Sequence, residues 1–314
     1  MAILSLRKHL GEIGELGTKN EIRLRRDFYV LPPSGLLKDI MRATRSPKPT
    51  EWTKPAEGQF FNHDWTEECQ GVTHDDSYWY LSSNHKGKQR VYRLSLTNKV
   101  VGYVKLAGNG SGHIGDIDYY QGRIYCAMEN PIKILIIDTQ AFNGWRPVNL
   151  TGESGGGPPQ SSCPWCALNP WNGLLYSSNN GDDAPGENLL RAYRFDSSSG
   201  NFLHLPSADI TLQEKLRRIQ GAVFSKNGHV LLASNHTNDI RCYSVLNGYF
   251  VGRASIQKDG SWNVEEEVEG LTIWEGLSYN GTPTHVHVIL LDNDAPDDDD
   301  IYFKHYHVPL VKDL

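Results

Sequence analysis

Residues 218–235 read RIQGAVFSKNGHVLLASN, in which a glycine turn leads into one apolar strand and a second apolar strand ends at an asparagine. The same pattern recurs along the chain, and its final asparagines are Asn84, Asn130, Asn179, Asn235 and Asn293. A repeat of about 50 residues that contains several short strands is typical of β-propellers. The repeat therefore predicts an all-β fold in which four-stranded blades surround a central channel.

The number of blades and the closure of the ring follow from the two ends of the chain. We expect five blades, with six as the alternative. The last repeat stops at Leu314 without a fourth strand, and an open edge strand promotes aggregation. We therefore expect a strand from the N-terminal side to close the ring, and EIRLRRDFYVL (21–31) is the candidate. Residues 1–50 then form a charged N-terminal extension and residues 51–314 the propeller.

Composition excludes several classes of protein. The 314 residues carry a net charge of −6 and no large basic block in the repeats, so a nucleic-acid partner is not expected. There is no apolar run of the ~18 residues that a membrane span needs, and no secretory signal. We expect a cytoplasmic monomer without a membrane partner. The five cysteines do not indicate a disulfide framework, and no nucleotide or flavin cofactor is expected.

Long connections between the repeats are candidates for lids over the channel. The segment ADITLQEKLRRIQ (208–220) has an apolar pattern that we interpret as one or two helical turns.

Alignment of the five strand starts separates a polar face from an apolar one. The starts read ECQGV (68–72), HIGDI (113–117), CPWCA (163–167), RIQGA (218–222) and EVEGL (267–271). Side chains in a strand alternate, so the first and third positions are expected to share a face. The second position is apolar in every copy and should pack between blades. Because the first two strands of a blade are antiparallel, the five asparagines should flank the same mouth of the channel.

Two interpretations of these polar residues remain open. The asparagines are suited to capping turns and bonding to neighbouring blades. Residues that differ between the copies are better candidates for function, namely Glu68, His113, Asp116, Arg218, Glu267 and Glu269. His113 near Asp116 and Asp118 indicates a histidine that a carboxylate orients as a general base.

The same mouth offers ligands for a hard cation. Calcium binds carboxylate and amide oxygens. The candidate metal ligands are Glu68, Glu269, Asn84, Asn130, Asn179, Asn235 and Asn293.

The chain resembles the calcium-dependent propeller hydrolases related to gluconolactonases, paraoxonases and strictosidine synthase. The resemblance covers residues 66–310 and depends on EGLT (269–272), on the start at Glu68 to Gly71, and on strand ends such as LLASN at Asn235. It implies a catalytic calcium held by Glu68 or Glu269 and by the amides of Asn130, Asn179 and Asn235. This chain departs from the usual six blades of that group.

These observations predict a non-redox enzyme that acts on a small organic substrate by cation-assisted hydrolysis or lactone opening. The predicted catalytic residues are His113, Asp116, Glu68 and Glu267, and the predicted substrate-binding residues are Gln70, Trp165, Arg218, Gln220, Trp65 and Asp118. One alternative is a metal-free cyclase or pericyclase of secondary metabolism, in which Trp165 and Trp65 form apolar walls. A second alternative is a non-catalytic ligand-binding or scaffold propeller.

Overall fold

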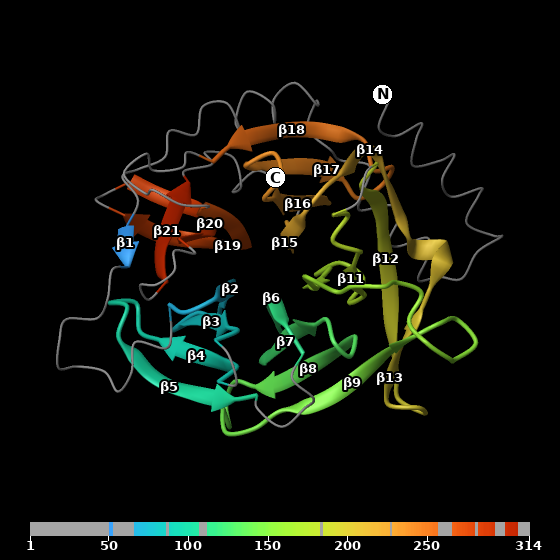
Figure 1. The fold of residues 1–314 in the computed structure, drawn as a ribbon, viewed down its shortest axis with the longest axis horizontal. Helices are drawn as coiled ribbons and strands as arrows, with labels where there is room; N and C mark the ends of the chain where they lie inside the picture. The colour runs from blue at the N-terminus through green and yellow to red at the C-terminus, as the bar shows by residue number, and fades with distance from the viewer. Residues whose placement is uncertain are drawn as a thin grey trace, which may run out of the picture.

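The structure, a computed structural model, describes residues 50–52, 66–85, 88–106, 112–182, 185–226, 228–256, 266–279, 282–292 and 299–306. These residues form sheets arranged around a central axis, and each sheet extends from an innermost strand to the periphery (Figure 1). Apart from the short helix η1 (Pro206–Ala208), all the described elements are strands. The predicted all-β propeller is therefore confirmed.

Within the described residues, all strands except β14 (Ile210–Leu216) group into five meanders of four strands each. The first is β2 (Cys69–His74), β3 (Trp79–Ser83), β4 (Arg90–Leu94) and β5 (Val100–Lys105); the second is β6 (Ile114–Tyr120), β7 (Arg123–Met128), β8 (Lys133–Asp138) and β9 (Arg146–Thr151). The third is β10 (Ala167–Leu168), β11 (Leu175–Ser177), β12 (Glu187–Asp196) and β13 (Asn201–His204); the fourth is β15 (Ile219–Phe224), β16 (His229–Ser234), β17 (Asp239–Ser244) and β18 (Phe250–Ser255). The fifth is β19 (Glu266–Tyr279), β20 (Thr282–Asp292), β21 (Asp300–Tyr306) and β1 (Thr50–Trp52). Parallel pairing of the outer strands β9 and β13 joins the second and third meanders into one larger sheet.

The position of a strand in its sheet explains its sequence pattern. The inner strands β3 and β16 are buried along their whole length, and they read as continuous runs because neighbouring sheets cover both of their faces. The outer strand β5 has four partly or fully exposed residues before its buried Val104. Strands near the axis are buried on both faces and therefore need apolar residues. Strands at the periphery are partly exposed and tolerate polar ones.

Hydrophobic clusters between neighbouring sheets hold the ring together. One cluster joins the first sheet to the second through Tyr80 and Leu135, and similar clusters join the following sheets. A fifth cluster joins the first sheet to the last one, where Leu81 packs in the same core as Ile289 and Phe303. The ring is therefore closed by apolar packing, which is the main stabilising contribution in such a fold.

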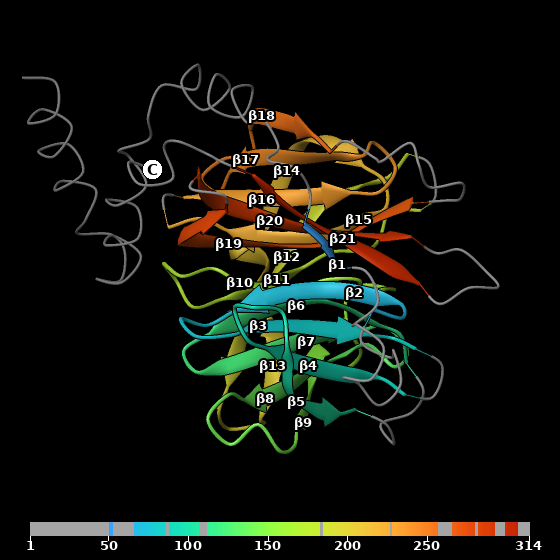
Figure 2. The same cartoon turned by 90° about the vertical axis from the view of Figure 1, so that its left-hand side faces the viewer.

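A strand from the N-terminal side completes the last sheet, as predicted. Strand β1 pairs antiparallel with β21, with Glu51 opposite Tyr302, and the two strands lie side by side in both views of the ring (Figures 1 and 2). This pairing covers the outer edge that the last repeat leaves open. The proposed closing segment 21–31 lies outside the described residues.

The segment predicted to be helical forms a strand instead. Strand β14 (Ile210–Leu216) pairs antiparallel with the first half of β12. Ile210, Leu212 and Leu216 are buried, whereas Thr211 and Gln213 are exposed. The helical interpretation was wrong because the apolar residues follow the two-residue period of a strand. The long strand β12 supplies the edge that this segment needs.

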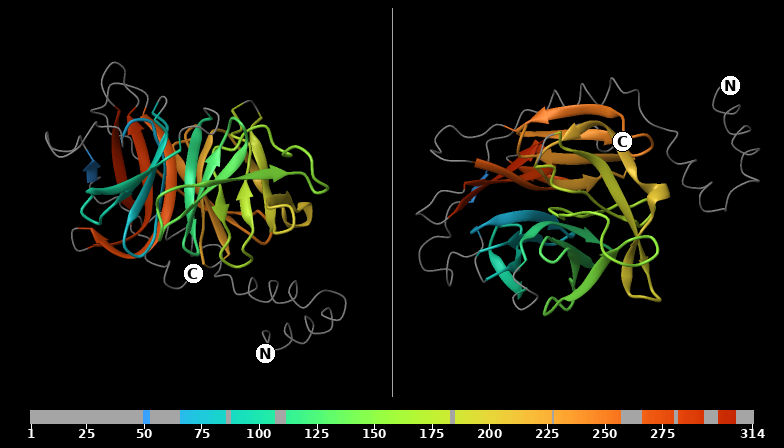
Figure 3. Two further views of the ribbon diagram at one scale, coloured as in Figure 1. Left: turned by 90° about the horizontal axis from the view of Figure 1, so that it is seen from below. Right: turned by 45° about the vertical axis from the view of Figure 1, so that its right-hand side comes forward.

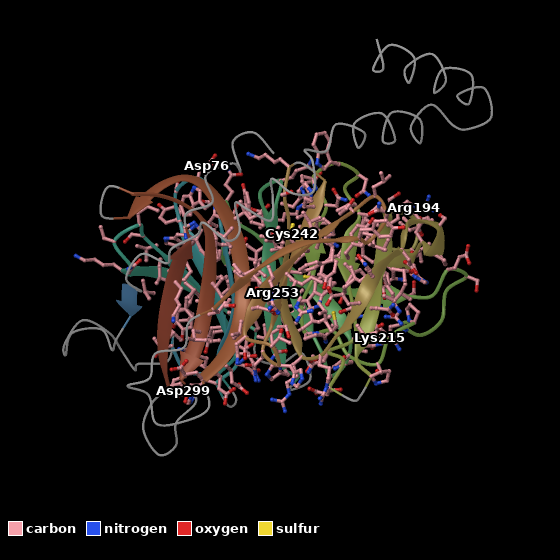
Figure 4. The ribbon with its side chains drawn as sticks, turned by 90° about the horizontal axis from the view of Figure 1, so that it is seen from above. Asp76, Arg194, Lys215, Cys242, Arg253 and Asp299 are labelled. Carbon is pink, nitrogen blue, oxygen red and sulfur yellow. The ribbon has the colours of Figure 1, made fainter. Side chains whose placement is uncertain are left out.

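The innermost strands run roughly along the channel axis (Figure 3). Each innermost strand therefore begins at one end of the channel, here named the amino mouth, and ends at the other, named the carboxyl mouth. Figure 4 shows these two ends: Asp299, which accepts the backbone N–H of Glu68 (2.9 Å), lies opposite Asp76, which follows β2. Among the residues that the structure describes, no helix has the length and apolarity that crossing a bilayer requires.

Candidate functional site

A β-bulge interrupts the start of four innermost strands. The pairing register shifts between Cys69 and Gly71, between Ile114 and Ile117, between Ile219 and Gly221, and between Val268 and Leu271. A bulge inserts one extra residue and resets the alternation of side chains. The assumption of unbroken alternation at these starts was therefore wrong. The apolar second position is confirmed, because Cys69, Ile114, Ile219 and Val268 are each 0% exposed.

The fourth position of the strand starts meets at the channel axis, and Asp116 occupies it in the second sheet. The carboxylate of Asp116 is fully buried. Its Oδ1 accepts the backbone N–H groups of Val72 (3.2 Å) and Ile117 (2.9 Å), and its Oδ2 accepts that of Ala222 (3.2 Å). Burial raises the pKa of Asp116 well above its usual range, and the three N–H bonds act in the opposite direction. Asp116, a predicted catalytic residue, thus cross-links three sheets.

Glycines make room for this carboxylate. A Cβ atom at Gly270 would lie 2.4 Å from Oδ1 of Asp116 and 2.5 Å from the Cα of Gly71, and one at Gly221 would lie 2.9 Å from Oδ2. These positions therefore require glycine. We name Gly71, Asp116, Cys166, Gly221 and Gly270 the plug, because they fill the axis between the two mouths.

The asparagines connect sheets. Oδ1 of Asn84 accepts the backbone N–H of Ile114 (3.2 Å), and Oδ1 of Asn235 accepts that of Val268 (3.0 Å). Each bond ties the end of one blade's second strand to the start of the next blade, which is the structural role described above for such asparagines. Asn130 is exposed, and Asn293 lies outside the described residues.

Carboxyl and amide groups gather on the amino-mouth side of the plug. Glu269 is 1% exposed, and Nε2 of Gln220 donates to its Oε1 (3.4 Å). Burial raises the pKa of Glu269 well above its usual range, and the nearby carboxylate of Glu267 adds to this effect. Gln70 is buried, whereas Glu68 and Glu267 are partly buried. The backbone of Glu68 is in the left-handed region, with φ of 48°.

The predicted calcium ligands match this arrangement poorly. The amide oxygens of Asn84 and Asn235 already accept backbone N–H groups, and Oδ1 of Asn179 accepts the N–H of Ser161 (2.8 Å). In the described part of the chain, no group of three His, Cys, Asp or Glu side chains is placed to hold a metal ion. Calcium binding therefore stays a prediction, which the metal content of the purified protein tests.

His113 faces a carboxylate that the sequence interpretation missed. Its Nδ1 lies 3.7 Å from Oε2 of Glu129, and its backbone carbonyl accepts the N–H of Glu129 (2.9 Å). Asp116 and Asp118 instead bond to the backbone of other strands. Burial lowers the pKa of His113 and raises the pKa of Glu129. At neutral pH this pair therefore offers a neutral imidazole beside a carboxyl group that protonates more readily than usual.

Glu129 also lines a polar cavity of about 460 Å³ at the amino mouth, which we name the amino-mouth cleft. Its lining residues are Glu129, Ser161, Ser162, Asn179, Asn180, Gly181, Asp182, Pro185, Gly186 and Glu187. The carboxylate of Glu187 accepts a hydrogen bond from Nδ2 of Asn179 (2.7 Å) and forms an ion pair with Arg191 (3.2 Å). Asp182 pairs with Arg218 (3.3 Å), a predicted substrate-binding residue that is about half exposed. Of the predicted site residues, Asn179 lines the cleft, whereas His113 and Arg218 lie beside it and contact its lining residues Glu129 and Asp182.

Among the residues that the structure describes, no aromatic side chain lines this cleft. Trp165 is 0% exposed, its Nε1 donates to Oγ of Ser178 (3.0 Å), and its ring packs in the core between the third and fourth sheets. Trp65 lies outside the described residues. The polar groups around the cleft therefore set its chemistry.

Asp118 lies on the opposite side of the plug, and its protonation should make stability depend on pH. Burial raises the pKa of Asp118 from 3.8 to about 7, against the bond that its Oδ2 accepts from the N–H of Leu168 (2.7 Å). The folded protein then binds a proton more tightly than the unfolded chain. Stability is therefore full below the unfolded pKa and is lost as the pH rises through the folded pKa, by up to about 4 kcal/mol.

The isosteric substitution Asp118→Asn isolates this contribution. We expect the stability of the wild type against urea to fall as the pH rises from 4 to 8. The stability of Asp118→Asn should fall less steeply, because Asp116 and Glu269, whose pKa values are also raised, keep their own contributions to the pH dependence. Equal pH slopes in the two proteins would contradict the assignment of a raised pKa to Asp118.

A comparison with one solved structure supports the fold. No known protein family and no curated protein matches the chain. Among solved structures, the chain is similar to a glutaminyl cyclase from Myxococcus xanthus, with 14% identity and a TM-score of 0.55 over 84% of this chain and 97% of that one. It is also similar to a luciferin-regenerating enzyme, with 11% identity and a TM-score of 0.42 over 82% of this chain and 95% of that one. Membership of the gluconolactonase-related superfamily stays a prediction.

Proposed function

We propose that the protein is a non-redox hydrolase that acts on a small polar ester or lactone bound in the amino-mouth cleft. The proposal is carried by one observation, the pairing of His113 with Glu129 at the wall of a polar cavity. A neutral histidine next to a carboxyl group is the arrangement that general-base catalysis uses.

The proposed reaction needs two proton transfers. With Nδ1 of His113 facing Glu129, Nε2 removes a proton from a water molecule, and the resulting hydroxide attacks the carbonyl carbon of the substrate. The tetrahedral intermediate collapses with cleavage of the carbon–oxygen bond, and the imidazolium returns its proton to the leaving alkoxide. Glu129 acts as a positioning residue that holds the imidazole and stabilises its charged form. The 3.7 Å between Nδ1 of His113 and Oε2 of Glu129 is longer than a hydrogen bond, so the mechanism requires this distance to shorten when the substrate binds.

The lining of the cleft supports a polar substrate and water as the nucleophile. Two serines, two asparagines and three carboxyl groups border the cavity, and such groups bind hydroxyl and carbonyl substituents. Ring closure of an apolar substrate would instead need a wall that shields and folds it. Of the two residues predicted to form that wall, Trp165 is packed in the core, and Trp65 lies outside the described residues. Hydrolysis is therefore favoured over cyclisation.

A panel of substrates tests the proposal. We expect hydroxylated lactones to be opened faster than aryl esters of similar size, with acid release followed in weakly buffered indicator solution. Reaction in water labelled with heavy oxygen should place the label in the product acid, whereas a cyclisation would not incorporate it. Metal content and activity in excess chelator test whether a bound cation assists the reaction. No opening of any lactone or ester in the panel would overturn the proposal in favour of a non-catalytic binding protein.

A further inference from the structure

A second cavity, of about 330 Å³, lies at the carboxyl mouth beyond the plug. Each innermost strand contributes one side chain to its floor, two residues after the plug position, where alternation returns the side chain to the axis. The floor residues are Thr73, Asp118, Leu168, Val223 and Thr272. The plug separates this cavity from the amino-mouth cleft.

The floor is divided into a polar and an apolar half. Thr272, Thr73 and Asp118 belong to the fifth, first and second sheets, which are neighbours in the ring, and Leu168 and Val223 belong to the third and fourth. Oγ1 of Thr73 accepts the backbone N–H of Tyr119 (2.9 Å), which leaves the hydroxyl proton for a ligand. One carboxyl oxygen of Asp118 accepts the N–H of Leu168 (2.7 Å), and the backbone N–H of Tyr119 also interacts with this carboxylate. An ionised carboxylate has about four lone-pair sites, so acceptor capacity is left for a ligand.

Flat aromatic side chains form the walls. The indole of Trp274 stacks on the imidazole of His74 with ring centroids 4.1 Å apart and planes within 5° of parallel. The edge of Trp79 and the bond between Nε2 of His74 and the carbonyl of Ile273 (2.7 Å) hold this stack in place. Phe224 lines the cavity from the fourth sheet. These walls suit a planar ring better than a saturated one.

We propose that the carboxyl mouth is a second binding site, for a flat, uncharged ring that carries a hydrogen-bond donor and an acceptor side by side, as an aromatic lactam does. Thr73 donates to the acceptor, Asp118 receives the donor, and Leu168 with Val223 covers the apolar edge. The volume is at the lower end for ligand pockets, which limits the occupant to one or two rings. This site does not depend on the proposed hydrolysis.

Pyridone is the probe, and its binding is measured by NMR titration of the full chain with labelled leucine, valine and threonine methyl groups. We expect saturable shifts at Leu168, Val223 and Thr73. Asp118→Asn should weaken binding on the order of tenfold. The amide oxygen of the new asparagine would accept the N–H of Leu168, so its NH₂ group would face the donor of the ligand and could not accept from it. His113→Gln, at the other mouth, should leave the affinity unchanged.

Two analogues test the chemistry of the ligand. Piperidone, the saturated counterpart, and N-methylpyridone, which lacks the donor, should each bind on the order of tenfold more weakly than pyridone. Equal affinity for pyridone and piperidone would overturn the proposal. So would an Asp118→Asn protein that binds pyridone as tightly as the wild type, shifts confined to the amino mouth, or no saturable shift at all.

Discussion

Gly270→Ala is expected to abolish or severely weaken folding. The new methyl group would lie 2.4 Å from Oδ1 of Asp116, 2.5 Å from the Cα of Gly71 and 2.8 Å from the backbone N of Val72. The one side-chain atom among these neighbours is the carboxylate oxygen of Asp116, which backbone N–H groups hold in place. Two sheets must therefore move apart, or the carboxylate must leave its three N–H donors. Overpacking alone costs about 1–3 kcal/mol. Buried N–H groups would also lose their hydrogen bonds to Asp116. We therefore expect Gly270→Ala to lower the free energy of unfolding by about 4–6 kcal/mol in total.

Thermal and urea unfolding, together with soluble yield, measure this effect. Gly144→Ala is the matched control, because a Cβ there meets no atom within 4 Å, and its stability should differ from wild type by less than about 0.5 kcal/mol. Gly221→Ala, with its nearest contacts at 2.9 Å, should fall between the two. A Gly270→Ala protein that unfolds like the wild type would show that the axis is more loosely packed than described here.

His113→Gln should lower the rate of lactone opening by about 10²–10⁴-fold, because the loss of a general base has effects of this size. Glutamine keeps hydrogen-bonding capacity but takes up no proton near neutral pH. In the wild type, the rate should fall with decreasing pH only below the usual histidine pKa of 6.5, since burial lowers the pKa of His113. His113→Gln should lose this acid limb, as measured by kcat/KM across the pH range.

His85→Gln provides the matched control. His85 also faces a carboxylate, with its Nδ1 3.2 Å from Oε2 of Glu67, but neither residue lines the amino-mouth cleft. Its substitution should leave the acid limb in place. Glu129→Gln should reduce kcat more than it changes KM, as expected of a positioning residue. Equal activity of His113→Gln and wild type on a hydrolysed substrate would remove His113 from the mechanism and leave hydrolysis itself to be explained by other groups.

The partner of His113 could not be predicted from the sequence. The tight turn between β6 and β7 pairs Tyr120 with Arg123 and Ile117 with Cys126, and continuing this register would place His113 opposite Asn130. The bulge shifts the pairing by one residue, and His113 faces Glu129 instead. In this chain the bulges lie where strands of different sheets meet at the axis, and the spacing of residues within one strand does not reveal such contacts. No prediction came from the fourth position, although its three glycines and one aspartate are visible in the aligned strand starts and are a sequence signal for a filled axis.

The sequence by itself determined the repeat, the all-β propeller, the buried second position and the need for a strand from the N-terminal side, because periodic apolar burial acts at every copy. Only the tertiary structure decided which polar groups meet. It placed Asp116 at the axis, gave Asn84 and Asn235 cross-sheet bonds, and buried Trp165. It also turned residues 210–216 into a strand and separated the channel into two mouths. These features arise from contacts between residues far apart in the chain, which local spacing does not encode.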